Sequence, residues 1–244
     1  MSGQPLPYKT DDGLTFEGYF AAPQNRSGLA GVLVVPEAPG LGAHVKRRVD
    51  SLAKAGYAAL GVDLHGKGAL ATSPDQARAW VGELKAQPEM LIARLDAALA
   101  ALSDRPEVDP DRLSAAGYCF GGWCVMELAR AGRPLRSVSV FHGSVSSTRG
   151  AEAITGSVLV CSGDTDPFVP VEQLLAFQTE MSAAGVDFEI CLYGSVKHGF
   201  TDADQPMQGP AFGYSPKADA RSWDSFMREL TDAVGAPAAP ELQA

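Results

Sequence analysis

The sequence predicts an α/β fold with a mostly parallel central sheet of about seven to eight strands and helices on both of its faces. Short apolar runs typical of strands alternate along the chain with segments of helical periodicity. The 244 residues have an ordinary globular composition, 45% hydrophobic and 20% charged, and no internal repeat or linker divides them. We therefore expect residues 1–244 to form a single domain, with residues 236–244 as a frayed, Ala/Pro-rich tail.

The first part of the chain contains apolar runs and two amphipathic segments. One segment places Val45, Val49 and Leu52 on one helical face, and Gly56 is typical of the position just after a helix. Pro88 suits the first turn of a second helix, whose apolar stripe continues to residue 102. We expect strands at residues 14–21, 29–35 and 57–62, and helices at 43–55 and from 88 onward.

The second part repeats the same alternation. A strand at residues 112–118 leads into Cys119, and a helix then runs towards Arg130. The last helix carries Trp223 and Phe226 on its apolar side. Further strands are expected at residues 135–141, 157–161 and 186–193, and a further helix at 171–184. Because the carboxyl ends of parallel strands meet at one edge, functional residues should follow these strands.

The charge and cysteine content exclude several classes of function. A net charge of −9 argues against binding to nucleic acid or to an anionic membrane. No stretch approaches the length of a membrane span, and the polar N-terminus lacks the apolar region of a secretory signal, so we expect a cytoplasmic protein. The cysteines show no zinc-binding spacing, and we expect neither a metal nor a cofactor. A monomer is expected, with a dimer as the alternative.

The segment from Gly117 to Gly122 predicts a cysteine nucleophile at Cys119. Its Gly-Tyr-Cys-Phe-Gly-Gly pattern, between a strand and a helix, is that of the nucleophile elbow of α/β-hydrolases, with Cys in place of Ser. The glycines leave room for a sharp turn that lifts the thiol above the sheet. The following helix N-terminus favours a thiolate. Cys124, Cys161 and Cys191 are interpreted as small buried hydrophobic residues.

Two downstream loops supply candidate partners for Cys119. In α/β-hydrolases the acid and then the histidine follow the nucleophile along the chain. Asp166 follows the strand at 157–161, and His198 follows the strand at 186–193. His198 can take the thiol proton, and a buried Asp166 can orient its ring. Asp164 is the alternative acid, although its position nearer the strand end also suits a turn cap.

A glutamate and a backbone amide follow the second strand. Glu37 is unusual there, because a carboxylate that faces a thiol opposes thiolate formation. We hypothesise that it keeps Cys119 neutral until substrate displaces it. The N–H groups of Ala38 and Phe120 are the expected oxyanion donors. The remaining histidines, His44, His65 and His142, are more simply explained as structural, although the last two follow strands and suit a pocket wall.

At this point the sequence resembles the dienelactone hydrolase family, from about residue 11 to residue 230. The resemblance is carried by Glu37, by the elbow at Cys119 and by the four motifs Asp63-Leu64-His65-Gly66, Gly163-x-x-Asp166, Val169-Pro170 and His198-Gly199-Phe200-Thr201. It implies an α/β-hydrolase without a cofactor that opens a lactone or ester through a thioester acyl-enzyme. The implied triad is Cys119, Asp166 and His198, with Glu37 interacting with the thiol.

One departure from the family concerns the substrate. Members that open dienelactone hold its carboxylate with arginines, one of them shortly after the catalytic histidine. The corresponding stretch here is Thr201-Asp202-Ala203-Asp204, without an arginine. Arg78 is a candidate for the other arginine, although a solvated helix residue explains it equally simply. The candidate substrate-contacting residues are Arg78, His65, His142, Trp123 and Phe200.

Three functions are compatible with these residues. The first is an esterase or lactonase of the dienelactone hydrolase kind, acting on a small-molecule ester or lactone. The second is a broad carboxylesterase or thioesterase with the same triad. The third is a redox or ligand sensor that uses Cys119 as a reversible thiol. A sensor usually has a resolving cysteine nearby, whereas Cys124 lies five positions along the helix and should point away.

Overall fold

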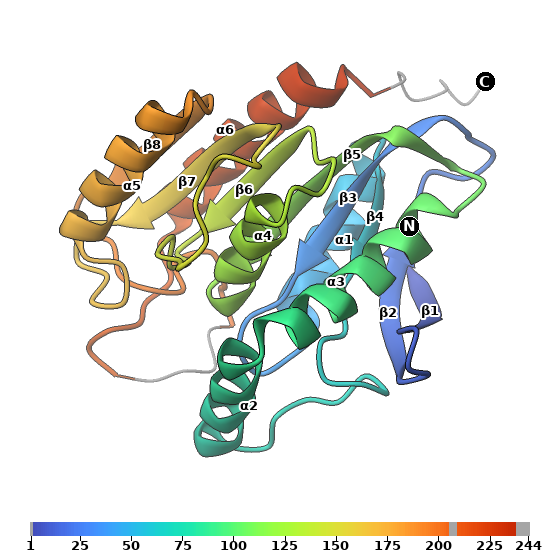
Figure 1. Cartoon of the computed structure of the whole chain (residues 1–244), viewed down its shortest axis with the longest axis horizontal. Coiled ribbons are helices and arrows are strands. Elements are labelled where there is room, and N and C mark those ends of the chain that lie inside the picture. The colour runs from blue at the N-terminus through green and yellow to red at the C-terminus, as the bar shows by residue number, and fades with distance from the viewer. Residues whose placement is uncertain (1, 205–208, 238–244) are drawn as a thin grey trace.

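A computed structural model describes residues 2–204 and 209–237 of the chain (Figure 1). The expected tail from residue 236 therefore lies almost entirely outside the described residues. The strands are β1 Gln4–Lys9, β2 Thr15–Ala21, β3 Leu29–Val35, β4 Ala58–Gly61, β5 Val108–Tyr118, β6 Ser137–Phe141, β7 Ser157–Gly163 and β8 Phe188–Tyr193. The helices are α1 Ala43–Lys54, α2 Pro74–Ala86, α3 Pro88–Ser103, α4 Phe120–Arg130, α5 Val171–Ala184 and α6 Pro216–Val234.

The described strands form one eight-stranded sheet with the order β1-β2-β4-β3-β5-β6-β7-β8. Six neighbouring strands are parallel, namely β4, β3, β5, β6, β7 and β8 in the order of the sheet. At one edge, β2 pairs with β4 and β1 pairs with β2, both in antiparallel register. The predicted α/β-hydrolase fold class is thereby confirmed. In the sheet, β3 lies between β4 and β5. The chain therefore first continues to one side of β3 and then crosses to its other side, so the strand order reverses between β3 and β5. In α/β folds, binding sites lie at such a reversal.

Two elements were not expected from the sequence. Strand β1 contains Pro5 and Pro7, which argue against a central strand but are tolerated at a sheet edge, where β1 lies. Helix α2 has only Ala77 and Leu84 buried, so its apolar stripe is too weak to stand out. Its start is nevertheless well defined, because the Ser73 hydroxyl accepts a hydrogen bond from the N–H of Gln76.

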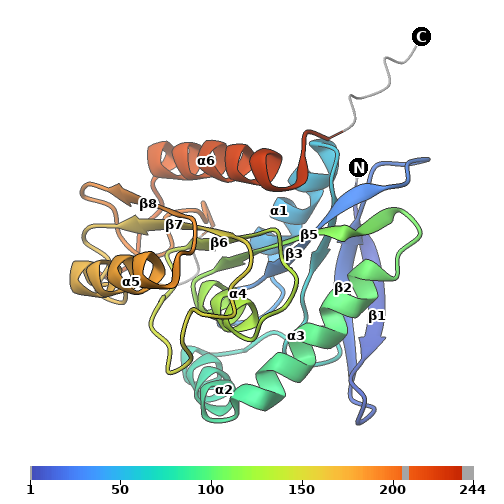
Figure 2. The same ribbon diagram turned by 45° about the horizontal axis from the view of Figure 1, so that its top comes forward.

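The helices cover both faces of the sheet (Figure 2). Helices α3, α4 and α5 pack on one face with α2 at their edge, and α1 and α6 pack on the other. Strand β3 is buried along its whole length, as expected for a parallel strand covered on both sides. Each fully buried valine or leucine in such a strand contributes about 1.5–3 kcal/mol to folding. Two apolar cores therefore fix the strands that carry the site.

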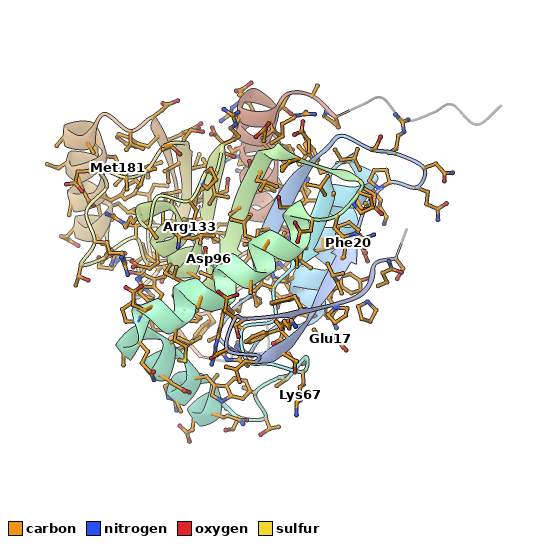
Figure 3. All side chains as sticks on the ribbon, turned by 45° about the vertical axis from the view of Figure 1, so that its right-hand side comes forward. Glu17, Phe20, Lys67, Asp96, Arg133 and Met181 are labelled. Carbon is orange, nitrogen blue, oxygen red and sulfur yellow. The ribbon has the colours of Figure 1, made fainter. Side chains whose placement is uncertain are left out.

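Polar contacts at the surface join helices to loops. The guanidinium of Arg133, after α4, donates two hydrogen bonds to the Asp96 carboxylate on α3, at 2.7 and 2.6 Å (Figure 3). Both side chains are about one third exposed, so solvent screens the pair and its contribution is at most about 1 kcal/mol. No helix in the described part of the chain is long and apolar enough to cross a membrane.

Candidate active site

Cys119 occupies a strained turn between β5 and α4. Its φ is +54° and its ψ is −114°, a conformation that non-glycine residues rarely adopt. The Cys119 N–H donates to the carbonyl of Phe141 at 3.0 Å, and its carbonyl accepts from the N–H of Gly122 at 3.1 Å. These bonds fix the turn from both sides. The thiol is half-buried at the N-terminus of α4, where the helix dipole favours an anion.

The glycines of the elbow are required by close backbone approach. A Cβ added at Gly117 would lie 2.0 Å from the carbonyl oxygen of Gly121. A Cβ at Gly121 would lie 2.2 Å from the carbonyl oxygen of Val35, at the end of β3. Both distances are far below van der Waals contact, and the obstacle is backbone that cannot move aside. The turn therefore forms only with glycine on both sides of Cys119, as the sequence pattern predicts.

His198 and Asp166 lie together with Cys119 at the carboxyl edge of the sheet. The Nε2 atom of His198 is 3.0 Å from the Cys119 sulfur, and its Nδ1 atom is 2.7 Å from an Asp166 carboxylate oxygen. The other Asp166 oxygen accepts a hydrogen bond from the N–H of Phe168 at 2.9 Å. The Asp166 side chain is fully buried. The carboxylate therefore fixes the ring so that Nε2 points at the thiol.

The surroundings of His198 favour its charged form. Burial disfavours a charged ring, but the Cys119 sulfur and the Asp166 carboxylate outweigh that effect and raise the pKa of His198 to about 10. A protonated ring 3.0 Å from the sulfur stabilises a thiolate. The arrangement is therefore suited to a resting ion pair between the two side chains.

Asp164 caps a turn, and none of the side-chain hydrogen bonds within residues 2–204 and 209–237 joins it to His198. Its Oδ1 accepts from the N–H of Ser195 at 2.5 Å and from the N–H of Val196 at 3.3 Å. These bonds hold the loop between β8 and His198 against the end of β7. Of the two acids that the sequence left open, Asp166 is the one beside the histidine.

Glu37 lies after β3 but is bound by His44 rather than by the thiol. Its Oε1 is 2.5 Å from the Nδ1 atom of His44 on α1. The other nitrogen of His44 contacts the Nε atom of Arg48 at 3.2 Å. Among the hydrogen bonds of residues 2–204 and 209–237, none joins Glu37 to Cys119. The expected contact between Glu37 and the thiol is thus replaced by a contact to a histidine that the sequence suggested to be structural.

Arg48, which contacts His44, connects the Glu37–His44 pair to α6 and to the loop after His198. Its guanidinium donates to the Thr201 carbonyl at 2.8 Å, and it pairs with the Asp219 carboxylate on α6. The guanidinium carbon also lies 5.8 Å from the ring centre of Tyr118, the residue before Cys119. Glu37, His44 and Arg48 therefore link the loop after β3 to the loop that carries His198.

Phe120 and Ala38 carry the two backbone amides that the sequence predicts as oxyanion donors. Phe120 begins α4, where an N–H has no acceptor within the helix. Ala38 follows β3, and both Ala38 and Cys119 are partly buried against the same apolar core. His65 interacts with the Ala38 backbone and stacks on Trp80 with ring centres 4.2 Å apart. Burial lowers the pKa of His65 to about 4, so its ring is neutral at physiological pH.

Aromatic rings surround His198. Phe168 is 52% exposed, and its ring centre lies 4.9 Å from that of His198. Phe212 lies 5.5 Å from both rings. The two phenylalanines come from separate loops, and neither follows a recognisable motif, so sequence reasoning missed them. An exposed aromatic side chain beside His198 suits contact with an apolar group.

The predicted substrate-contacting residues differ in how deeply they are buried. Phe200 and His142 are 0% and 1% exposed, so burial removes them from direct contact with substrate. His142 binds the Thr201 hydroxyl at 2.8 Å and lies behind the His198 ring. Trp123 is half-buried on α4 and stacks on Phe120. The indole N–H of Trp123 donates to the Ser146 carbonyl.

Arg78 lies on the exposed surface of α2. Its guanidinium pairs with Asp75 one turn earlier, and its side chain is 69% exposed. This is the solvated helix residue that the sequence left open. The acidic residues after His198 are paired with a helix, because the Asp202 and Asp204 carboxylates both contact Arg47 on α1. The described residues contain no group of side chains that could hold a metal ion.

The chain is similar over nearly its whole length to known hydrolases. The model of the dienelactone hydrolase family matches residues 16–233. The solved structure of m3DLH has a TM-score of 0.90 and 37% identity, over 96% of this chain and 98% of that one. A dienelactone hydrolase-like promiscuous phosphotriesterase from metagenomic libraries has a TM-score of 0.89 and 34% identity, over 96% and 99%.

A curated relative is similar at lower identity. A probable 2-oxo-3-(5-oxofuran-2-ylidene)propanoate lactonase of Bradyrhizobium sp is 27% identical over 224 residues, which are 86% of each chain. Since the family model covers β2 to α6 and every loop of the site described above, the chain belongs to the dienelactone hydrolase family.

Proposed function

We propose that this protein hydrolyses an ester or lactone through a Cys119–His198–Asp166 triad and a thioester acyl-enzyme. The observation that carries the proposal is the position of His198, whose two ring nitrogens lie 3.0 Å from the Cys119 sulfur and 2.7 Å from Asp166. Membership of the dienelactone hydrolase family supports the same reaction class. The name of the lactonase relative supports a lactone as one form of the substrate.

The first half of the reaction uses the ion pair. The Cys119 thiolate attacks the carbonyl carbon, and the N–H groups of Phe120 and Ala38 stabilise the oxyanion. The tetrahedral intermediate then collapses, the carbon–oxygen bond to the leaving group breaks, and the Nε2 proton of His198 passes to that oxygen. In a lactone the leaving oxygen stays attached to the acyl chain, so ring opening gives a hydroxyacyl thioester.

The second half returns the enzyme to its starting state. Neutral His198 takes a proton from water, and the resulting hydroxide attacks the thioester carbonyl. The carbon–sulfur bond breaks, which releases the acid and regenerates the thiolate beside the imidazolium. Asp166 stays ionised and stabilises the ring in its charged form.

Glu37 fits a positioning role in this scheme. Because its carboxylate binds His44, it does not compete with His198 for the thiol. The loop that it belongs to also carries Ala38, so the Glu37–His44 contact helps to hold the second oxyanion donor. This interpretation replaces the hypothesis that Glu37 keeps Cys119 neutral.

The surroundings of His198 favour an uncharged, apolar substrate group. Phe168 and Phe212 offer aromatic surface, and the acidic pair after His198 is bound to Arg47. The stretch shortly after His198, Thr201 to Asp204, contains no arginine that could bind a substrate carboxylate. A broad carboxylesterase or thioesterase is therefore the second candidate. The similarity to a promiscuous phosphotriesterase adds an aryl phosphotriester to the substrates worth assaying.

The proposed function is tested with p-nitrophenyl esters, dienelactone and a small lactone panel. We expect Cys119→Ala to abolish turnover of every substrate and Cys124→Ala, which removes a fully buried thiol on the same helix, to retain it. Activity that persists in Cys119→Ala would exclude the proposed nucleophile. No turnover by the unaltered protein would favour the sensor function of Cys119.

The substrate preference is tested with a matched pair of exposed residues. Phe168→Ala should lower kcat/KM for an aromatic or long-chain ester about tenfold more than for the acetate, because it removes apolar contact area. Leu175, on α5, is similarly exposed at 57%, and Leu175→Ala should change neither value. Equal losses for both esters in Phe168→Ala would contradict an apolar contact.

A further inference from the structure

Strands β7 and β8 bring two further cysteines side by side. Cys161 and Cys191 are direct partners in the parallel register of these strands. Neighbouring strands lie about 4.8 Å apart, which is within the Cα separation that a disulfide spans. Both side chains belong to the sheet face covered by α6. We propose that Cys161 and Cys191 form a second reactive thiol site, which a peroxide converts into a reversible disulfide.

The contacts of the pair show that both sulfur atoms face the same small space. The Cys191 sulfur lies 3.7 Å from the Ser225 hydroxyl on α6 and donates to the Glu189 carboxylate at 3.4 Å. The Tyr193 hydroxyl, two residues further along β8, donates to the Cys161 sulfur at 3.6 Å. Each of the two sulfur atoms therefore contacts one hydroxyl group. Both sulfur atoms lie between α6 and the edge of the sheet.

Cys191 is the thiol that reacts first. It lies half-buried on β8, the last strand of the sheet, whereas Cys161 is 0% exposed. The neighbouring Cys161 thiol, with smaller help from Ser225, lowers the pKa of Cys191 to about 7 against the opposing effects of burial and Glu189. The proton shared by the pair therefore stays with Cys161, whose pKa is raised by the same contact. Glu189 is itself bound by Arg228 at 2.7 Å, which reduces its repulsion of a thiolate.

The chemistry requires a peroxide as the oxidant. The Cys191 thiolate attacks one peroxide oxygen, the oxygen–oxygen bond breaks, and the departing oxygen leaves as water after it takes a proton. The Cys161 sulfur then attacks the Cys191 sulfenic acid. The sulfur–sulfur bond forms, and the hydroxyl leaves as water with the Cys161 proton. Two thiols and one hydrogen peroxide give one disulfide and two waters.

This site is separate from the nucleophile and independent of the proposed function. Sequence reasoning interpreted Cys161 and Cys191 as buried hydrophobic residues, which the half-buried Cys191 contradicts. The pair does lie on the strands that lead to the catalytic loops, since Asp166 follows β7 and His198 follows β8. A disulfide would tie these two strands together, and a thiol reductant would release them.

The proposal is tested in the full chain with Cys119→Ala, so that the nucleophile cannot react. After treatment with hydrogen peroxide and alkylation of free thiols, we expect a peptide pair joined through Cys161 and Cys191 that a thiol reductant separates. Adding Cys191→Ser should abolish it. Adding Cys124→Ser should leave it unchanged, because Cys124 is fully buried among apolar residues on the opposite face.

A second readout does not depend on peroxide. In the same Cys119→Ala protein treated with dithiobis(nitrobenzoate), the attack of Cys191 should be followed by attack of Cys161, so that two coloured thiolates are released and no adduct remains. With Cys161→Ser, one thiolate should be released and a stable adduct should stay on Cys191. The proposal is overturned if the Cys119→Ala protein keeps an adduct on Cys191, or if peroxide takes Cys191 to a sulfinic acid while Cys161 stays free.

Discussion

The Nε2 atom of His198 lies 3.0 Å from the sulfur of Cys119, close enough for a proton to belong to either side chain. The raised pKa of His198, about 10, assigns that proton to the ring at neutral pH. Cys119 should therefore be alkylated by iodoacetamide at a rate that changes little between about pH 7 and 9, unlike an ordinary thiol with a pKa of about 8.5. In His198→Gln the rate should instead fall about tenfold per pH unit below that value.

The same pKa sets the direction of a stability effect. The pKa of His198 is raised from 6.5 to about 10 in the folded chain. Its charge therefore stabilises the fold fully below pH 6.5, and that contribution is lost as the pH rises towards 10.

The alkylation experiment also has an outcome that would contradict the ion pair. An alkylation rate of Cys119 in the unaltered protein that rises tenfold per pH unit, as in His198→Gln, would show that no resting ion pair exists.

Asp166 and Asp164 form a matched pair for testing the acid. Asp166→Asn should lower kcat about 10²- to 10⁴-fold, because an amide favours the wrong tautomer of His198 and does not stabilise its charge. Asp164→Asn keeps the oxygen that accepts from the N–H groups of Ser195 and Val196. Its kcat should stay within about threefold of the parent value. Steady-state kinetics on one p-nitrophenyl ester decides the matter, and equal losses in both variants would contradict the assignment.

The contact between Glu37 and His44 should be measurable as a coupling energy. His44→Ala leaves the half-buried Glu37 carboxylate without its partner at 2.5 Å, and should lower the free energy of unfolding by about 1–3 kcal/mol. In a Glu37→Gln background the same change should cost much less. Urea unfolding of the two single variants and the double variant gives the coupling. Additive losses would show that the two side chains do not stabilise each other.

Two glycines should respond oppositely to replacement by alanine. At Gly117 a Cβ would meet the Gly121 carbonyl at 2.0 Å, so Gly117→Ala should lower the free energy of unfolding by at least about 3 kcal/mol. Gly82 lies exposed within α2 with open space around it, so Gly82→Ala should raise it by about 0.5–1 kcal/mol. Thermal or urea unfolding of the purified variants tests both, and a stable Gly117→Ala would mean that the elbow is not as tight as described.

The sequence was sufficient for the sheet apart from its edge strand β1, and for the placement of Cys119, Asp166 and His198 after strands. Cys119, Asp166 and His198 each follow a strand, and parallel strands bring their carboxyl ends to one edge, so order along the chain predicts proximity. Pairing between elements was not predictable in the same way. The contact of Glu37 with His44 depends on how α1 packs on the sheet, and the contact of Phe168 with Phe212 joins two irregular loops. Periodicity carries no information about either.

Cross-strand register was equally hidden from the sequence. Cys161 and Cys191 are 30 positions apart in numbering but are direct partners once β7 and β8 align. A shift of one residue would place one of the thiols on the opposite face of the sheet. The sequence therefore predicted both strands but not the thiol pair.

The most direct test of the proposed mechanism is to trap the acyl-enzyme. The protein is mixed rapidly with p-nitrophenyl acetate, quenched in acid within the first turnover and analysed by peptide mass spectrometry. We expect a burst of p-nitrophenolate equal to the concentration of active protein, with an acetyl group on Cys119 that neutral hydroxylamine removes. Ester hydrolysis that proceeds without a burst, with Cys119 unmodified at every quench time and with activity retained in Cys119→Ala, would contradict nucleophilic catalysis by this cysteine.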